Sequence, residues 1–210
     1  MGRKGVEILR PVIDKLLSNA RFYSWLQGLP GFADPKVRII RTEMPVLENQ
    51  RILDLGCGPG DRANIFPQDS YLGIDIDHQA IAFAQQKYWG EFRVMDALQL
   101  ALDDSSFDWV LAGGFFHHLS DADALGALKE ARRVLKPSGK MLALAVVWPL
   151  SRLNLVGWAI RSLDRGRYIR TNNEFARLFA VHFDIEKIYP FKVLLLDLFA
   201  FVLKPKKRGN

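Results

Sequence analysis

A glycine-rich turn after a short apolar segment constrains the fold of this chain more than any other feature of its sequence. Residues 52–60 read ILDLGCGPG, in which Gly56, Gly58 and Gly60 stand two residues apart. The apolar residues before the turn predict a strand buried in a parallel sheet. Because glycines carry no side chain, the backbone can turn sharply there and a ligand can lie against it.

Carboxylates follow this strand and the next one. Asp54 lies at the carboxyl end of the first strand, where it can accept a hydrogen bond from a cationic amine or order the loop. Fifteen residues after Gly60, a second predicted strand ends in Asp75, with Asp77 two residues further on. A carboxylate at either position can bind the vicinal hydroxyls of a ribose, and Asp75 is the better placed. The alternative for Asp75 is a turn former at the strand end. Together these residues indicate a nucleoside cofactor.

The glycine spacing narrows the class of nucleoside. A dinucleotide site needs G-x-G-x-x-G, but here the third glycine comes one residue early and Asp61 occupies the expected position. An aspartate at a helix N-terminus repels a pyrophosphate. A P-loop is excluded because no Lys-Ser/Thr pair follows the glycines. A cofactor without phosphates and with a positive centre fits these residues better.

With Asp54, Gly56, Gly58 and Gly60 matching the signature D-x-G-x-G-x-G, the chain resembles the class I S-adenosylmethionine-dependent methyltransferases. The resemblance covers about residues 50–203. It implies a Rossmann-like α/β fold, with a mostly parallel seven-stranded sheet, helices on both faces and an antiparallel last strand. It also implies S-adenosyl-L-methionine as cofactor and S-adenosyl-L-homocysteine as product. The alternative is a glycine-rich turn in another α/β protein.

Strands and helices alternate from Arg51 onward, as expected of a parallel sheet covered on both faces. Strands are predicted at 51–55, 70–75, 91–95, 107–113, 141–147, 183–189 and 194–203, and helices at 61–66, 78–89, 121–135 and 171–181. Residues 136–139, Lys-Pro-Ser-Gly, are expected to end the third of these helices, and Thr171-x-x-Glu174 is a predicted capping box that opens the fourth. We expect an N-terminal helical cap over residues 1–48, a cofactor-binding domain over 49–203 with a lid insertion at 148–175, and a disordered basic tail over 204–210.

The resemblance also assigns cofactor contacts, position by position. Asp75 and Ile76 are expected at the ribose and one face of the adenine, and Asp96 and Ala97 at the adenine edge. The methionine part lies against the ends of the first and fourth strands. Tyr23 in the helical cap is a further candidate, with core packing as its alternative. The full set of candidates is Asp54, Gly56, Cys57, Gly58, Gly60, Asp75, Ile76, Asp96, Ala97, Ala112, Gly113 and Tyr23.

Two histidines, His117 and His118, follow the fourth predicted strand and are the candidate catalytic residues. Either can remove a proton from the methyl acceptor or hold the loop by hydrogen bonds; for His118 the structural role is favoured. Orienting the reactants supplies about 7–11 kcal/mol, whereas a positioned base adds about 10²–10⁴-fold. The reaction can therefore proceed without a dedicated base.

The segment after the fifth strand is rich in arginine, and residues 151–210 carry 12 Lys/Arg against 5 Asp/Glu. The candidate lid residues are Arg165, Arg167, Tyr168 and Arg170. An Asp164–Arg165 pair that fixes the lid is the first interpretation, and an arginine clamp on a carboxylate or phosphate is the second. Docking on an anionic membrane ranks third, so peripheral membrane contact is not favoured.

Several acceptor classes are disfavoured by absent motifs. The Asp/Asn-Pro-Pro-aromatic run of amino-methylating nucleic-acid enzymes is replaced by residues 113–116, Gly-Gly-Phe-Phe, and no nucleic-acid module is recognisable. The single cysteine, Cys57, lies in the glycine loop, which favours a reducing cytoplasm and a non-nucleophilic role. No metal is expected. The sequence predicts a methyltransferase acting on a small acidic or amphiphilic molecule. The alternatives are a non-catalytic S-adenosylmethionine sensor or scaffold, and an enzyme of the same fold that uses this cofactor for another reaction.

Overall fold

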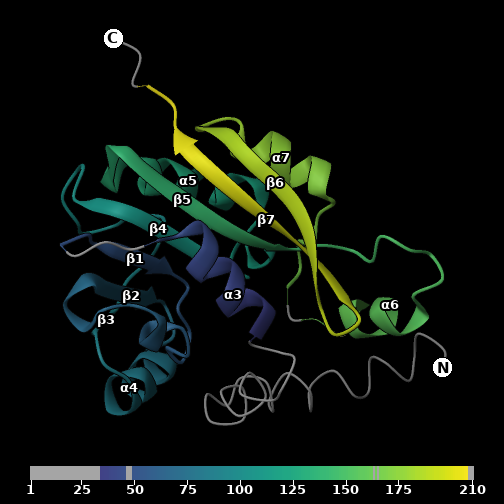
Figure 1. Ribbon diagram of the computed structural model, residues 1–210, viewed down its shortest axis with the longest axis horizontal. Helices are drawn as coiled ribbons and strands as arrows, with labels where there is room; N and C mark the ends of the chain where they lie inside the picture. The colour runs from purple at the N-terminus through teal and green to yellow at the C-terminus, as the bar shows by residue number, and fades with distance from the viewer. Residues whose placement is uncertain (1–33, 46–48, 163, 165, 208–210) are drawn as a thin grey trace.

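The computed structural model describes residues 34–45, 49–162, 164 and 166–207. Its centre is a seven-stranded sheet in the order β3-β2-β1-β4-β5-β7-β6 (Figure 1). All neighbouring strands are parallel except β7, which is antiparallel to both β5 and β6. The strands are β1 (Ile52–Leu55), β2 (Tyr71–Asp75), β3 (Glu91–Val94), β4 (Phe107–Gly113), β5 (Leu135–Val146), β6 (Phe183–Val193) and β7 (Leu196–Pro205). The predicted Rossmann-like sheet with an antiparallel last strand is confirmed.

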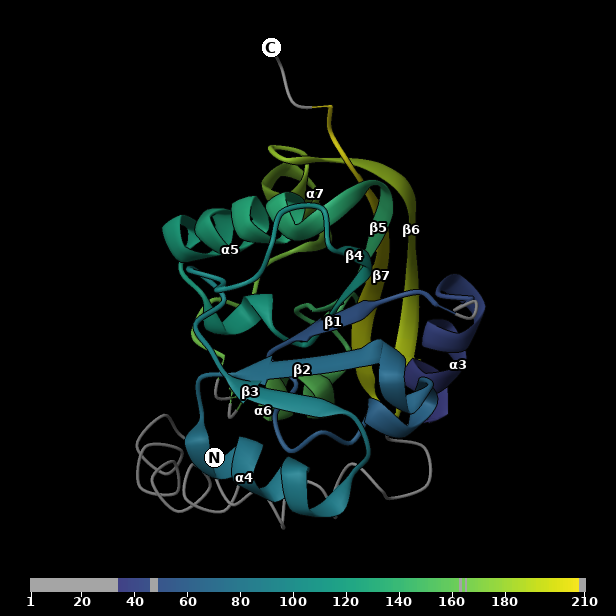
Figure 2. The ribbon, with the colours of Figure 1, turned by 90° about the vertical axis from the view of Figure 1, so that its left-hand side faces the viewer.

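Helices cover both faces of the sheet, also as predicted. They are α3 (Asp34–Glu43), α4 (His78–Lys87), α5 (Asp121–Val134), α6 (Leu155–Ser162) and α7 (Asn172–Phe179), with short 3-10 helices η1 (Ala63–Ile65), η2 (Gln68–Ser70) and η3 (Phe116–His118). Apolar residues of α5 and α7, which lie side by side in Figure 2, form one core with Leu53 and Leu55. Those of α3 and α4 form the opposite core with Ile52. Successive side chains of β1 therefore enter different cores, as the pleat of a strand requires.

The second half of the sheet differs in detail from the prediction. β5 begins at Leu135 directly after α5, so the four residues expected to form a loop belong to the strand. They bulge opposite β4, where Phe107 pairs with Leu135 and Trp109 pairs with Lys140. The β6–β7 hairpin is longer than expected, because its turn lies at Leu194 and Leu195.

Both ends of the described chain are tied to the sheet. β7 continues through Pro205, two residues into the segment expected to be a basic tail, because Lys204 pairs with Asp184 of β6. Near the start of the chain, Tyr189 of β6 donates a hydrogen bond of 3.1 Å to Glu43 of α3. Tyr23 and most of the expected cap lie outside the described residues.

The capping box predicted at Thr171 forms as expected. The Glu174 N–H donates to Thr171 Oγ1 at 3.3 Å, and the Thr171 N–H donates to Glu174 Oε2 at 2.7 Å. Two donors at the helix start are thereby satisfied reciprocally, which begins α7 at Asn172. Within the described ranges, none of the helices has the length and hydropathy needed to span a bilayer.

Candidate active site

The glycine loop between β1 and η1 has the conformation that its sequence requires. Gly56, Gly58 and Gly60 adopt φ values of 64°, 55° and 82°, in the left-handed region that disfavours side chains. A Cβ added to Gly60 would lie 2.8 Å from Ala84 of α4, and one added to Gly56 would lie 2.5 Å from the Phe115 ring. Among the residues that the structure describes, a Cβ added to Gly58 meets none within 4 Å. The loop therefore packs against protein at its two ends and faces open space at its middle.

The buried side chain of Asp54 orders this loop. Its carboxylate is fully buried and accepts hydrogen bonds from Tyr71 Oη at 2.8 Å and Arg62 Nε at 3.1 Å. Burial, followed by the charge of Asp54, raises the pKa of the Tyr71 hydroxyl well above its usual range, which keeps it a donor. Of the two roles predicted for Asp54, the structure shows loop ordering.

Arg62, which the sequence analysis did not single out, connects the glycine loop to β4. Its Nη2 donates to the Gly56 carbonyl at 3.2 Å, and a Cβ added to Gly113 would lie 3.2 Å from its Cζ. The guanidinium therefore lies between the carboxyl ends of β1 and β4. The sequence signal for this role was the position of Arg62, a basic residue close in sequence to both Asp54 and Gly60.

A second cation, Lys36 of α3, also escaped the sequence analysis. It is half-buried, and burial, followed by the charges of Arg62 and Arg161, lowers its pKa to about 8. Lys36, Arg62 and Arg161 come from a helix, a loop and the lid, which are far apart in sequence. Arg62 and Arg161 are therefore close enough for their charges to act on Lys36.

The end of β2 is bonded to the glycine loop through Asp75. The carboxylate of Asp75 accepts from the Gly58 N–H at 2.8 Å and from the Asp77 N–H at 2.9 Å. It therefore borders the open space over Gly58. Asp77, the rival for the ribose, instead caps α4 by accepting from the N–H groups of Gln79 and Ala80. Between the two aspartates, the side chain of Ile76 is 70% exposed, an apolar surface next to the loop.

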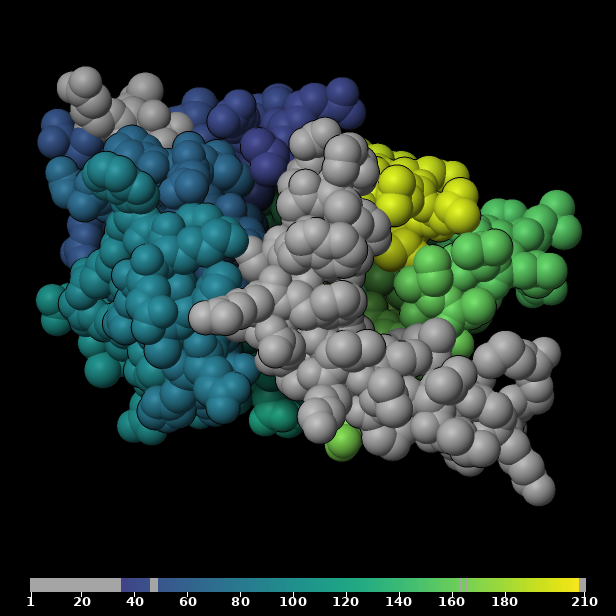
Figure 3. Space-filling view, turned by 90° about the horizontal axis from the view of Figure 1, so that it is seen from below, coloured from purple at the N-terminus to yellow at the C-terminus, as the bar shows by residue number. Residues whose placement is uncertain are grey.

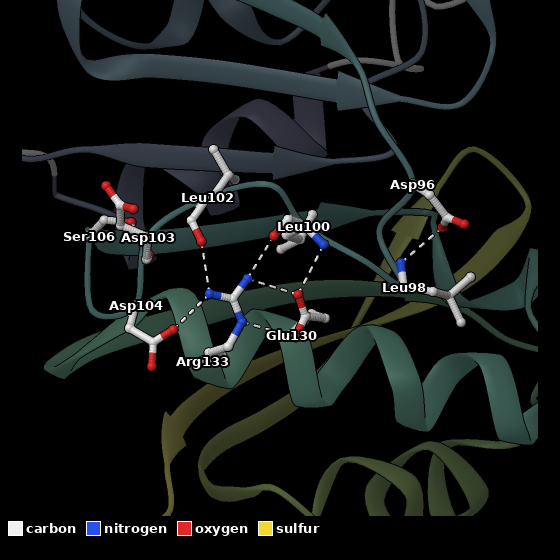
Figure 4. A network of polar contacts seen from close by, with 9 residues as sticks. All are labelled: Asp96, Leu98, Leu100, Leu102, Asp103, Asp104, Ser106, Glu130 and Arg133. Carbon is white, nitrogen blue, oxygen red and sulfur yellow. Dashed lines mark hydrogen bonds and ion pairs between the residues drawn. The ribbon is translucent and has the colours of Figure 1, made fainter.

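Asp96 and Ala97 lie beside Asp75 because the Met95 N–H donates to the Asp75 carbonyl at 3.0 Å. Asp96 is exposed and Ala97 is buried. One oxygen of Asp96 accepts from the Leu98 N–H at 2.9 Å, the turn-forming contact seen at the right of Figure 4. Asp96 and Ala97 therefore lie next to the ribose candidate, and their contact with the adenine stays a prediction.

A polar network on α5 holds the segment that follows Asp96 (Figure 4). Arg133 donates to the carbonyls of Leu100 and Leu102, both at 2.8 Å, and to Glu130 Oε2 at 2.8 Å. Glu130 in turn accepts from the Leu100 N–H at 2.9 Å. The sequence analysis missed this network, although Glu130 and Arg133 stand three residues apart, at helical spacing.

Cys57 contributes backbone but no thiol to the loop. Its N–H donates to the Ile74 carbonyl at 2.9 Å, while its buried side chain packs against Gly73. Burial, followed by the charges of Asp54 and Asp75, raises the pKa of the thiol well above its usual range. A thiol held protonated in this way is a poor nucleophile, as predicted.

His117 is buried just after β4 and faces the lid. Its Nε2 lies 3.4 Å from Asp164 Oδ1, and its Nδ1 has no hydrogen-bond partner among the described residues. Because the carboxylate can only accept, Nε2 carries a proton, and in the neutral ring Nδ1 presents a lone pair. Burial raises the pKa of Asp164, but His117, the Gly166 N–H and Arg161 together outweigh it and hold this pKa well below its usual range. The result is an oriented imidazole with an unused acceptor.

The histidine next to it is placed differently. His118 is exposed, and its ring centroid lies 4.0 Å from that of His117.

Ala112 is buried and Gly113 is half-buried at the end of β4, close to the glycine loop. The predicted contacts at the ends of β1, β2, β3 and β4 thus lie along one edge of the sheet.

The lid is held by Asp164 and Arg170, both named in the sequence analysis, through partners that were not predicted. Asp164 pairs with Arg161 Nη1 at 3.1 Å, whereas the predicted partner Arg165 lies outside the described residues. The expected clamp residue Arg170 is buried, and it donates to Asp121 and to the carbonyls of Phe116 and Leu119. Its donors anchor the lid to the loop after β4, so an anion clamp by Arg170 is wrong.

The other two lid candidates are exposed. Arg167 and Tyr168 both point their side chains away from the core, and Tyr168 donates its N–H to the His117 carbonyl at 3.0 Å. The lid therefore touches the candidate base directly. Among the residues that the structure describes, no cluster of His, Cys, Asp and Glu is suited to a metal ion.

Comparison with known proteins gives consistent likenesses. A family model for a methyltransferase domain matches residues 53–143. The demethylmenaquinone methyltransferase of Lactobacillus johnsonii is 31% identical over 144 residues, which cover 63% of this chain and 55% of that protein. The probable tRNA methyltransferase 9B of Bos taurus is 32% identical over 145 residues, which cover 68% of this chain and 30% of that protein.

The matches cover different shares of the known proteins. The chain spans 55% and 30% of the lengths of these two curated relatives. Among solved structures, an S-adenosylmethionine-dependent methyltransferase from Methanosarcina mazei has a TM-score of 0.65 at 24% identity, and the match covers 80% of this chain and 98% of that one. This structural likeness concerns the fold.

Proposed function

The chain belongs to the class I S-adenosylmethionine-dependent methyltransferases, and from this premise we propose that it methylates a small acidic or amphiphilic molecule. The observation that carries the proposal is the open space over Gly58, bordered by the Asp75 carboxylate and by the exposed Ile76. This arrangement suits an adenosine, because the uncovered backbone at Gly58 is followed by a carboxylate that can accept from the ribose and by an apolar side chain for the adenine.

The residues present fit this cofactor along its whole length. Asp75 accepts from the ribose hydroxyls, Ile76 lies against the adenine, and Asp96 with Ala97 meets the adenine edge. The glycine loop, with Ala112 and Gly113, holds the methionine part. Arg62 and Lys36 suit its carboxylate, because both are cations at the same crevice. When bound, the cofactor supplies an activated methyl group.

His117 acts as the general base toward the methyl acceptor in this proposal. In the neutral ring the Asp164 carboxylate keeps the proton on Nε2, and Nδ1, a buried atom without a hydrogen-bond partner among the described residues, is the atom that would accept a proton from a hydroxyl, amine or carboxyl group once the lid admits the acceptor. Since the low pKa of Asp164 keeps it ionised, this orientation persists across the working pH range. Arg161 and the rest of the lid exclude water from the reacting groups.

The class of acceptor is inferred from what surrounds the site. The cations Lys36 and Arg62 suit an acidic group on the acceptor, and the exposed apolar residues of α6 suit an amphiphilic one. A demethylmenaquinone methyltransferase among the relatives favours this class over nucleic acid, although another relative is named as a tRNA methyltransferase. The buried single thiol suits a reducing compartment, so we place the activity in the cytoplasm.

Turnover with labelled S-adenosylmethionine tests the proposal. Acidic and amphiphilic hydroxyl, amine and carboxyl compounds are incubated with the protein, and transfer of label is measured. The proposal expects product with at least one of these classes. Cofactor binding without product across the panel would favour the sensor or scaffold instead.

His117→Gln and Asp164→Asn test the role of the histidine. We expect kcat to fall by about 10²–10⁴-fold in His117→Gln, with KM for the acceptor little changed. Asp164→Asn should lower kcat by a smaller factor and change the pH profile of kcat, since the histidine loses its oriented tautomer. His118→Gln is the matched control and should retain activity. Equal kcat values in His117→Gln and His118→Gln would rule out the base.

A further inference from the structure

Helix α6 shows its apolar side to solvent and its charged side to the protein. Its buried residues are Gly157 and Arg161, whereas Leu155 is 74% exposed and Val156 is 54% exposed. Arg161 points inward, where Nε donates to the Val147 carbonyl at 3.2 Å and Nη2 to the Asp197 carbonyl at 3.3 Å. A surface helix in water has the opposite arrangement. The outer face of α6 is therefore suited to an environment other than water.

This face continues beyond the helix. Leu153, immediately before α6, is 90% exposed, and Leu194 and Leu195 at the turn of the β6–β7 hairpin are also exposed. The two segments are joined, because Asn154 Nδ2 donates to the Leu195 carbonyl at 2.7 Å. Figure 3 shows the green α6 region standing out at one side of the molecule, next to the yellow residues of the hairpin. The lid patch, as we name it, consists of Leu150, Leu153, Leu155, Val156, Ile160, Leu194 and Leu195.

Among the described residues of the two segments that form the lid patch, the exposed charged side chains are positive. Arg152 and Lys192 are exposed in the two segments that form it. The sequence contains no Asp or Glu from 148 to 162 or from 190 to 196. The nearest carboxylate along the hairpin, Asp197, is buried, and its Oδ1 lies 3.9 Å from Lys192 Nζ. An apolar surface whose exposed charges are cations matches the interface of an anionic bilayer, where leucines enter the headgroup boundary and cations meet lipid phosphates.

A second copy of the chain fits this surface less well. In a two-fold symmetric dimer the same patch faces itself, so that Arg152 and Lys192 of each copy approach those of the other. On an anionic bilayer this repulsion is absent, and the lipid phosphates attract Arg152 and Lys192 instead.

We propose that the lid patch docks this protein on the surface of membranes that contain anionic lipids. The docked helix is connected to the candidate active site, because Arg161 of α6 pairs with Asp164, which in turn contacts His117. The docking itself does not depend on the identity of the methyl acceptor. It reverses the order of preference reached from the sequence, in which the lid was assigned to pairing first and to membranes last.

Vesicle flotation of the full chain tests the docking. Vesicles of phosphatidylcholine alone are compared with vesicles that also contain phosphatidylserine, at low and high salt. The protein is expected on the anionic vesicles, with binding that falls as salt rises. Val156→Glu and Leu153→Glu should each weaken binding by about tenfold or more, and Arg152→Glu by about fivefold. Val181→Glu, at an exposed valine after α7, is the matched control and should bind as wild type.

Other outcomes overturn the proposal. Absence of binding to anionic vesicles, or equal binding to both vesicle types, would do so. So would binding that Val156→Glu and Val181→Glu lower equally. A concentration-dependent dimer in light scattering that Val156→Glu dissociates would assign the patch to a second copy instead. Circular dichroism of each variant separates lost docking from lost folding, and cofactor binding by calorimetry separates it from a failure of the proposed function.

Discussion

At the scale of single residues, the site depends on what the three loop glycines leave uncovered. All three have positive φ, but only the space over Gly58 is open, since Gly56 meets Phe115 and Gly60 meets Ala84. The sequence predicted the glycines as a group. It could not tell which of them faces the ligand, because that depends on side chains from β4 and α4.

Alanine substitutions at two of these glycines separate binding from folding. Gly58→Ala adds left-handed strain of about 1–2 kcal/mol and a methyl group in the open space. We expect a folded protein whose affinity for S-adenosylhomocysteine is strongly reduced. Gly60→Ala carries the same strain and also a clash with Ala84, so its free energy of unfolding should fall further. Thermal denaturation and calorimetric titration of both variants check this, and unchanged affinity in a folded Gly58→Ala would contradict it.

The aspartates after β2 form a matched pair for testing the ribose contact. Asp75→Ala should weaken binding of S-adenosylhomocysteine by about 1.5–3 kcal/mol, because it removes a charged acceptor. Asp77→Ala removes the cap of α4 and should cost about 1 kcal/mol of stability without changing the affinity. Calorimetric titration and urea denaturation give the two quantities. An affinity loss in Asp77→Ala that equals the loss in Asp75→Ala would refute the assignment.

At the scale of elements, the sequence predicted well those helix and strand bounds that neighbouring residues determine. β4 has the predicted bounds, and α7 begins at its predicted capping box. The bulge at the start of β5 and the true turn of the β6–β7 hairpin depend on pairing with strands distant in sequence. The partners of Asp164 and Arg170 were missed for the same reason, since the lid meets the β4 loop only in the folded chain.

The α5 network makes a prediction about acid stability. A hydrogen bond from Arg133 is the main cause that lowers the pKa of Glu130, so the carboxylate stabilises the fold above its unfolded pKa. This contribution is lost as the pH falls through the folded pKa, below 4.5. Glu130→Gln should therefore lower stability at neutral pH by about 1.5–3 kcal/mol and reduce the acid dependence.

Urea denaturation of Glu130→Gln at neutral and acidic pH measures this effect. Glu91→Gln is the control, because Glu91 forms an exposed pair with Arg93 and should contribute about 0–1 kcal/mol. An equal pH dependence in wild type and Glu130→Gln would remove the network from the account.

At the scale of the whole molecule, the sheet brings separate functions to one edge. The carboxyl ends of β1, β2, β3 and β4 hold the cofactor candidates, and the lid after β5 contributes Asp164 and Arg161 from the other side. Burial, followed by the charges of Arg62 and Arg161, also lowers the pKa of Lys36 of α3. The class of fold and the cofactor were predictable because the signature lies in one loop. The partner of the candidate base His117 and the outward face of α6 come from tertiary contacts.

Calorimetric titration of the full chain with S-adenosylhomocysteine, alongside NAD and ATP, tests the central claim most directly. The open space over Gly58 beside Asp75 is expected to bind one S-adenosylhomocysteine per chain and neither of the two phosphate-bearing ligands. Binding of NAD or ATP, with none of S-adenosylhomocysteine, would contradict it.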